Sequence, residues 1–191
     1  MRELYHRLRA NPIIDLAVTL AVAIAIAYVV QLWVVKPFQI PSQSMESTFH
    51  VHDRIIAARF LYHFTDPARG DIIVFHPNGQ GDQAFRSDQI ASVVFVKRLI
   101  GMPGEWIYAS GGKVHVCTRS ATSGCRTLHE SYVSSRQDDF SPVHIPPNRY
   151  FMMGDNRANS DDSRDWGPIR RTQIIGRAFM VYWPPTRIRF F

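Results

Sequence analysis

The 191-residue sequence has few cysteines, few lysines and no long run of one charge. Its two cysteines cannot by themselves complete a four-ligand zinc site, so a structural zinc domain of the all-cysteine kind is excluded. Of the 22 basic residues 19 are arginine, and they stand singly, with no run longer than Arg170 and Arg171. The net charge of +6 is therefore spread along the chain, and we predict no nucleic-acid partner.

Internal repeats and low-complexity segments are also absent from the sequence. A content of 46% hydrophobic and 20% charged residues is typical of a globular protein and excludes an intrinsically disordered one. The length fits one ordinary domain, with room for a tethered extra element.

The longest apolar segment, residues 16–35, contains twenty residues and no charge. As a helix it would be about 30 Å long, which is the thickness of the hydrocarbon core of a bilayer. Three arginines precede it, so the positive-inside rule predicts that residues 1–15 are cytoplasmic and residues 36–191 are extracytoplasmic. We therefore expect a single transmembrane helix in a lipid bilayer. The alternatives are a cleavable secretory signal, whose apolar region is usually only about 7–15 residues long, and a buried core helix.

Beyond residue 36 the apolar residues come in short runs of strand length that are separated by turn signals. β-Branched and aromatic residues dominate these runs, as in β-strands. They lie at residues 54–57, 71–75, 92–100, 106–108, 114–116, 150–153 and 178–183. The polar segments 79–88 and 134–142 are predicted to be exposed loops. The pattern predicts a mainly β fold behind the transmembrane helix.

Ser44 is a candidate nucleophile in the segment that follows the apolar stretch. A serine hydroxyl reacts poorly until a base takes its proton, and the sequence has neither a Gly-x-Ser-x-Gly motif nor a recognisable triad histidine. A lysine desolvated by apolar neighbours can be that base, because its pKa falls toward neutrality. Lys97 fits, since strand alternation puts it on one face with Phe95 and Leu99. A lysine that extends to water from a strand edge is the alternative.

A second pair, Ser110 and Lys113, has the S-x-x-K spacing of penicillin-binding enzymes. The two glycines between them predict a turn instead of the helix that this spacing requires. No Ser-Asp-Asn or Lys-Thr-Gly companion motif is present. We interpret this pair as a coincidence.

Residues 154–167 contain two arginines and four aspartates in one polar segment. A calcium loop does not fit, because Arg164 would occupy the position of the turn glycine and Arg170 that of the bidentate glutamate. An ordered network of ion pairs fits the composition better.

Cys117 and Cys125 have seven residues between them, Gly124 included. This spacing suits a hairpin, so a disulfide could join two strands if the domain is exported to an oxidising compartment. Two free thiols are the alternative.

Four segments, taken in order behind the apolar stretch, resemble bacterial type I signal peptidases. They are PSQSM at 41–45, RGDIIVF at 69–75, VKRLIGMPGE at 96–105 and GDNRANSDDSRDWG at 154–167. The resemblance extends over residues 36–187. It implies a β-rich catalytic domain that uses a Ser-Lys dyad, a variant of the catalytic-triad arrangement.

The resemblance implies a role for each matching residue. Ser44 would be the nucleophile and Lys97 the general base, and Ser42 would help the Ser44 N–H to bind the oxyanion. Ser160 would form a hydrogen bond with Lys97 and orient it. The residues expected to brace the site as an ion-pair network are Asp155, Asp162 and Arg164.

The implied function is a membrane-bound serine endopeptidase that removes signal peptides from exported preproteins at the outer face of a bacterial cytoplasmic membrane. No metal or organic cofactor is implied. Ser47 departs from the family, which usually has proline there. The rival hypotheses are a self-cleaving Ser-Lys repressor, which would need a DNA-binding module, and a membrane-tethered binding domain in which Ser44 and Lys97 are incidental.

Overall fold

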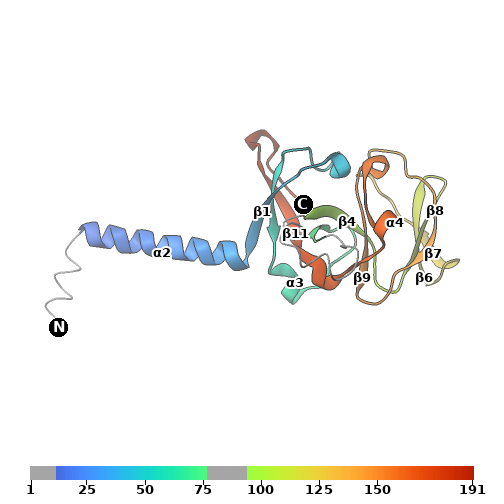
Figure 1. The fold of residues 1–191 in the computed structure, drawn as a ribbon, viewed down its shortest axis with the longest axis horizontal. Coiled ribbons are helices and arrows are strands. Elements are labelled where there is room, and N and C mark those ends of the chain that lie inside the picture. Colours follow the sequence, from blue (N-terminus) through green and yellow to red (C-terminus); the bar gives the residue numbers. More distant parts are fainter. Residues whose placement is uncertain (1–11, 77–93) are drawn as a thin grey trace.

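The structure is a computed structural model of the chain and describes residues 12–76 and 94–191, without the side chains of residues 29–33. The predicted loop at residues 79–88 and the arginines that precede the apolar segment lie outside the described residues. A long helix extends from a β-rich body (Figure 1).

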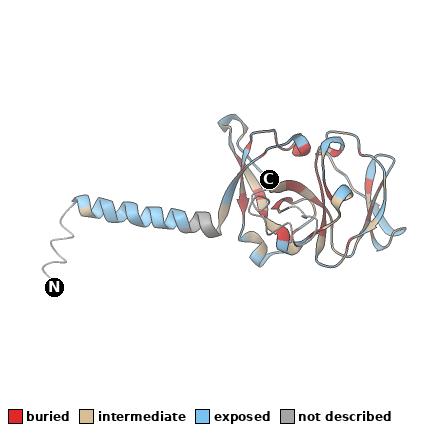
Figure 2. Ribbon diagram, in the orientation of Figure 1, coloured by how far each residue is buried: buried red, intermediate tan, exposed pale blue. Residues whose placement is uncertain are grey.

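The extended helix is α2, Pro12–Trp33, with 22 residues. Its described side chains are almost all exposed, and they include large apolar ones such as Ile24 at 68% (Figure 2). Within residues 12–76 and 94–191, no helix is both long enough and apolar enough to cross a membrane. The helix predicted at residues 16–35 ends earlier than expected, because Val35 pairs with Ala58 and begins a strand.

Eight antiparallel strands form the larger sheet, in the order β1-β2-β11-β3-β4-β9-β10, with β12 paired to β11. The strands are β1 Val35–Gln39, β2 Arg54–Ala58, β3 Ile72–Phe75, β4 Phe95–Gly101, β9 Arg149–Met153, β10 Ile169–Arg170, β11 Ile174–Trp183 and β12 Arg189–Phe190. In the middle of this sheet Ile73 of β3 pairs with Lys97 of β4. All four residues of β3 are buried, so the sheet centre lies in the core.

The smaller sheet has four antiparallel strands in the order β7-β6-β5-β8. They are β5 Trp106–Ser110, β6 Lys113–Ser120, β7 Ser123–Thr127 and β8 Phe140–His144. Gly111 and Gly112, with φ of +60° and +75°, make the turn between β5 and β6, as the sequence predicted. Cys117 of β6 and Cys125 of β7 are joined by a disulfide.

Short helices lie between the strands. They are η1 Gln43–Met45, α3 Leu61–Phe64, η3 Arg157–Asn159, α4 Ser163–Trp166, η4 Arg171–Gln173 and η5 Pro185–Arg187. The two sheets share an apolar core, in which Ile100 and Phe151 of the larger sheet pack with Ile107 and Val114 of the smaller one. Met45 and Phe49 belong to a separate core cluster under η1, so that helix is held by burial.

The mainly β prediction is confirmed, and each of the seven apolar runs contributes to a strand. The prediction of a loop at residues 134–142 is wrong at its end, where β8 begins at Phe140. The reason is packing, because the Phe140 ring stacks on Phe151 with centroids 5.9 Å apart.

Candidate active site

Ser44 lies in η1 and is only 8% exposed. The short helix η1 begins at Gln43 because Ser42, directly after Pro41, has an extended backbone with φ of −136°. It ends at Met45 because Glu46 is extended as well. The Phe49 N–H donates to the Met45 carbonyl at 2.7 Å, which closes the next turn above the core. The Ser44 hydroxyl oxygen lies 3.2 Å from that of Ser42, within hydrogen-bond distance.

Lys97 lies in the middle of β4 and is 4% exposed. Its amine lies 5.8 Å from the centre of the Phe95 ring, on the face that strand alternation predicted. Burial lowers the pKa of Lys97 to about 8, because removal of water disfavours the ammonium, while the carboxylates of Asp162 and Asp161 partly oppose this effect. A substantial fraction of this side chain is therefore neutral in mildly alkaline solution.

Ser44 and Lys97 line the same cavity, which has a volume of about 410 Å³. Its other lining residues are Ile40, Pro41, Ser42, Gln43 and Met45 from the segment around η1, Val94, Phe95 and Val96 from the segment of β4, and Asn159 and Asp161 from the loop before α4. In the described part of the chain no hydrogen bond joins the Lys97 amine to the Ser44 hydroxyl. The cavity brings a hydroxyl and a neutralisable amine to one apolar-walled space.

The loop before α4 is ordered around Asp162, which is fully buried. Asp162 caps α4 by accepting from the Arg164 N–H, and its carboxylate also pairs with the Arg164 guanidinium at 2.8 Å. The same carboxylate accepts from the Gly154 N–H at 3.0 Å, which ties the loop to the end of β9. The predicted ion pair between Asp162 and Arg164 is present.

The Ser160 hydroxyl lies elsewhere than expected. It donates to Asp162 at 2.8 Å, and among the described residues no hydrogen bond joins it to Lys97. A carboxylate is a stronger acceptor than a neutral amine, which accounts for this choice of partner. Ser160 is nevertheless close to Ser44, because Gly154 lies between them. A Cβ atom added at Gly154 would lie 2.3 Å from the Ser160 hydroxyl oxygen and 2.4 Å from the Ser44 carbonyl oxygen.

Asp155 is fully buried, but its partner is Arg98 and not Arg164. Two guanidinium nitrogens of Arg98 donate to the Asp155 carboxylate at 2.8 and 2.6 Å, and the Thr48 hydroxyl donates to it at 2.5 Å. The Tyr132 ring covers the guanidinium at 3.9 Å. Asp155 and Asp162 therefore belong to two separate ion pairs, with Arg98 and Arg164 as their respective partners. The sequence signal that could have identified Arg98 is strand alternation, because the residue after Lys97 points to the opposite face of the strand.

Ser47 has a φ of +85°, and its hydroxyl donates to the Tyr132 carbonyl at 2.6 Å. The proline ring restricts φ to about −65°, so a proline could not adopt this backbone. The departure at position 47 and the local conformation are therefore consistent with each other.

The disulfide between Cys117 and Cys125 belongs to the smaller sheet, and neither cysteine lines the cavity. The described residues contain no group of three or more histidine, cysteine, aspartate or glutamate side chains placed to hold a metal ion.

The chain is similar to known proteins over most of its length. The family model of "Signal peptidase, peptidase S26" matches residues 13–183. A signal peptidase I of Leptolyngbya laminosa is 36% identical, over 93% of this chain and 83% of that protein. A probable signal peptidase I-2 of Synechocystis is 35% identical over 93% of this chain and 77% of that protein. A signal peptidase I of Bacillus amyloliquefaciens is 29% identical over 95% of this chain and 94% of that protein.

Proposed function

Because the chain belongs to the signal peptidase family, peptidase S26, and is a serine endopeptidase, we propose that it cleaves signal peptides from preproteins with Ser44 and Lys97 as a catalytic dyad. One observation carries this proposal. Ser44 and Lys97 line one cavity, and burial lowers the pKa of Lys97 to about 8, where a neutral amine can accept a proton.

In the proposed reaction the Ser44 hydroxyl oxygen attacks the scissile carbonyl carbon while the Lys97 amine accepts the hydroxyl proton. The C–N bond then breaks, Lys97 returns the proton to the leaving amine, and the signal peptide stays on Ser44 as an ester. A water molecule gives a proton to Lys97 and attacks the ester. The bond between the acyl carbon and the Ser44 oxygen breaks, Lys97 returns the proton to that oxygen, and the signal peptide leaves as a carboxylate with Ser44 and neutral Lys97 restored.

Ser42 is proposed to stabilise the oxyanion that forms during this attack. Its hydroxyl, 3.2 Å from the Ser44 hydroxyl, is near enough to donate to the developing negative charge together with the Ser44 N–H. The other proposed supports act at a distance. Asp162 holds Ser160 and Arg164 in their loop, and the Asn156 N–H of the same loop donates to the Ser44 carbonyl at 3.1 Å. On the other side the Asp155–Arg98 pair holds the Thr48 hydroxyl.

The proposed dyad requires the Lys97 amine to reach Ser44 when a substrate is bound. A bound peptide would displace water from the cavity, which further disfavours the ammonium and favours a direct hydrogen bond to the hydroxyl. Catalytic hydrogen bonds commonly tighten in this way on substrate binding.

A cleavage assay tests the proposal. Purified protein in detergent is incubated with a preprotein, and the appearance of the mature protein is followed for wild type, Ser44→Ala and Ser110→Ala. Ser44→Ala is expected to abolish cleavage, whereas Ser110→Ala, which changes the coincidental S-x-x-K serine in the β5–β6 hairpin, should cleave at the wild-type rate. Wild-type activity in Ser44→Ala would refute the dyad.

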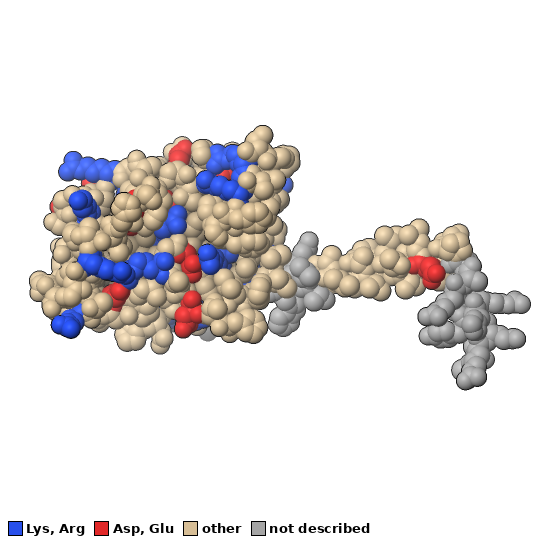
Figure 3. Space-filling view, turned by 180° about the vertical axis from the view of Figure 1, so that it is seen from behind, with Lys and Arg blue, Asp and Glu red and all other residues tan. Residues whose placement is uncertain are grey.

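We further propose that the apolar segment at residues 16–35, whose helical part ends with α2 at Trp33, anchors the chain in the bacterial cytoplasmic membrane, with residues 1–15 in the cytoplasm and residues 36–191 outside. The uncharged sequence of this segment and the exposed apolar side chains of α2 support the proposal. On the face seen in the space-filling view, the coloured part of α2 shows an acidic group near its outer end and is otherwise uncharged (Figure 3). Burial of these side chains in lipid would remove them from water.

Membrane anchoring is tested by extraction of a cell membrane fraction at alkaline pH, which strips peripheral proteins. The full chain should stay in the membrane pellet, and external protease added to spheroplasts should digest the catalytic domain. Recovery of the chain in the supernatant, or protection of the domain, would contradict the proposed anchor or its orientation.

A further inference from the structure

Asp161 differs from the other aspartates of the loop in which it lies. Asp155 pairs with Arg98, Asp162 with Arg164, and the Asp165 carboxylate accepts from the Asp162 N–H at 3.2 Å. Asp161 is exposed, and among the described residues its carboxylate takes part in no hydrogen bond or ion pair. Three aspartates of this loop therefore maintain its structure, whereas the fourth is available to an incoming molecule.

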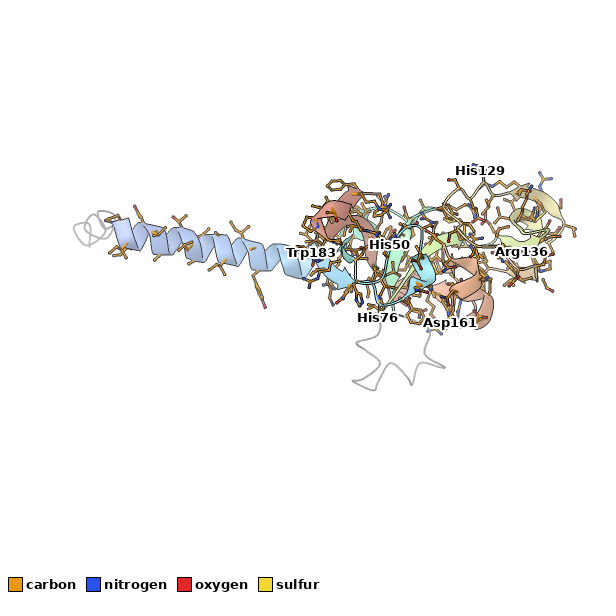
Figure 4. The ribbon with its side chains drawn as sticks, turned by 90° about the horizontal axis from the view of Figure 1, so that it is seen from above. His50, His76, His129, Arg136, Asp161 and Trp183 are labelled. Carbon is orange, nitrogen blue, oxygen red and sulfur yellow. A yellow bond between two sulfur atoms is a disulfide. The ribbon has the colours of Figure 1, made fainter. Side chains whose placement is uncertain are left out.

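Asp161 also has a distinctive position, because it lines the cavity that contains Ser44 and Lys97. Among the described lining residues it is the one carboxylate, and Lys97 is the one cation; the others are apolar or uncharged. Figure 4 shows Asp161 at the border of the β-rich body, on the same side as His76. A peptide that entered the cavity would therefore pass near one fixed negative charge.

The charge balance of the cavity changes when the proposed dyad is ready to react. Lys97 must then be neutral, which leaves the Asp161 carboxylate as the single charge among the lining residues that the structure describes. Because Asp161 is exposed, water screens its charge, so it acts mainly on a substrate side chain that lies close to it.

From this placement we propose that Asp161 is a specificity-determining residue, which favours substrates with a lysine or arginine near the cleaved bond and disfavours those with glutamate or aspartate there. The inference rests on the proposed function, since it assumes that the cavity binds the peptide around the scissile bond. An exposed ion pair of this kind changes selectivity by about two- to fivefold for each charge removed.

The same carboxylate acts on Lys97. The charges of Asp162, Asp161 and Asp155 raise the pKa of Lys97, and the charge of Arg164 lowers it, against a larger lowering by burial. Removal of the Asp161 charge should therefore lower the pKa of Lys97 further. A role confined to the fold of the loop would not have this consequence.

The test uses full-length protein in detergent and a set of peptides that differ at one position near the cleaved bond, which carries lysine, glutamine or glutamate. The kcat/KM for the lysine peptide divided by that for the glutamate peptide is measured with the residue moved through each flanking position. For at least one position, Asp161→Asn should lower this ratio by about two- to fivefold. Asp161→Lys should invert the preference.

Asp138→Asn is the matched control. Asp138 is also exposed and loses the same charge, but it does not line the cavity, so its selectivity ratio should equal that of wild type. Equal ratios for wild type and Asp161→Asn at every position would overturn the inference. If Ser44→Ala is inactive in the same assay, that result would leave the proposed function intact; an active Ser44→Ala would instead refute the proposed function.

A pH profile gives the second measurement. With the glutamine peptide, the rising limb of kcat/KM should move to lower pH in Asp161→Asn and stay in place in Asp138→Asn. A limb that does not move in Asp161→Asn would mean that its charge does not reach the cavity, and would also overturn the inference.

Discussion

The two faces of strand β4 hold a buried lysine and a partly buried arginine in different ways. Lys97 lies beside the cavity over the Phe95 ring, and no hydrogen bond or ion pair to its amine occurs among the described residues. Arg98, the next residue, points to the opposite face and makes a two-pronged ion pair with Asp155. One strand thus supports a cation that can lose its charge and a cation that is held charged.

The difference follows from the chemistry of the two side chains. A guanidinium does not lose its proton in a protein, so even the partial burial of Arg98 favours a carboxylate partner. An amine can lose its proton, and without a close partner burial lowers its pKa toward neutrality. The chain has only three lysines against 19 arginines, and one of these lysines occupies the position where deprotonation is useful.

The largest expected effect is the loss of activity when Lys97 is replaced by a permanent cation like that of Arg98. Lys97→Arg would put a permanent cation beside Ser44, so the general base would be lost and kcat/KM should fall by about 10²–10⁴-fold. Cleavage of a preprotein by the purified variant measures this. Lys113→Arg, on the exposed hairpin, is the control and should retain wild-type activity. A fully active Lys97→Arg would contradict the assignment of Lys97 as the base.

On the face of β4 that carries Arg98, we expect a substitution to lower the stability of the fold. Arg98→Met leaves the Asp155 carboxylate buried without its cation, and loss of one partner of a buried pair costs about 3–5 kcal/mol. The free energy of unfolding, measured with urea, should fall by this amount. Arg119→Met, at an exposed position of β6, should change it little. An equal effect of the two substitutions would show that the Arg98–Asp155 pair has no special weight.

On the face that carries Lys97, removal of the basic group should raise the free energy of unfolding instead of lowering it. Lys97→Met removes an amine that must be buried charged at pH 6, so the free energy of unfolding should rise there by about 1–3 kcal/mol. The gain should shrink as the pH rises from about 8 to 10.5, because the folded wild type releases the proton before the unfolded chain does. A loss of stability at pH 6 would mean that the buried amine is stabilised by a partner.

The smallest expected effect is in the pH profile of the wild type. The kcat/KM should rise with pH along a limb near 8, below the ordinary lysine value of 10.5, because only the neutral amine can accept the Ser44 proton. Stopped assays across pH 6 to 10 measure the limb. A limb near pH 4 would instead indicate a carboxylate as the base.

Local patterns in the sequence were sufficient for much of this description. Short β-branched and aromatic runs predicted the strands, because the side-chain alternation of a strand is a local property. The same alternation put Lys97 beside Phe95. Ser44 became a candidate through its order relative to the other segments, since a lone serine in a loop has no distinguishing signal.

The sequence by itself determined a mainly β chain with a long apolar segment, a candidate serine and a lysine on an apolar strand face. Only the tertiary structure decided the partners. Asp155 pairs with Arg98, 57 residues away, and accepts from Thr48 at a separation of 107 residues. The Ser160 hydroxyl donates to the carboxylate of Asp162, two residues along the chain, and not to Lys97. Only packing brings Asp161 to the cavity of Ser44 and Lys97. The physical reason is that patterning specifies which face of a strand is apolar, whereas the choice among several possible acceptors depends on distances that only the folded chain sets.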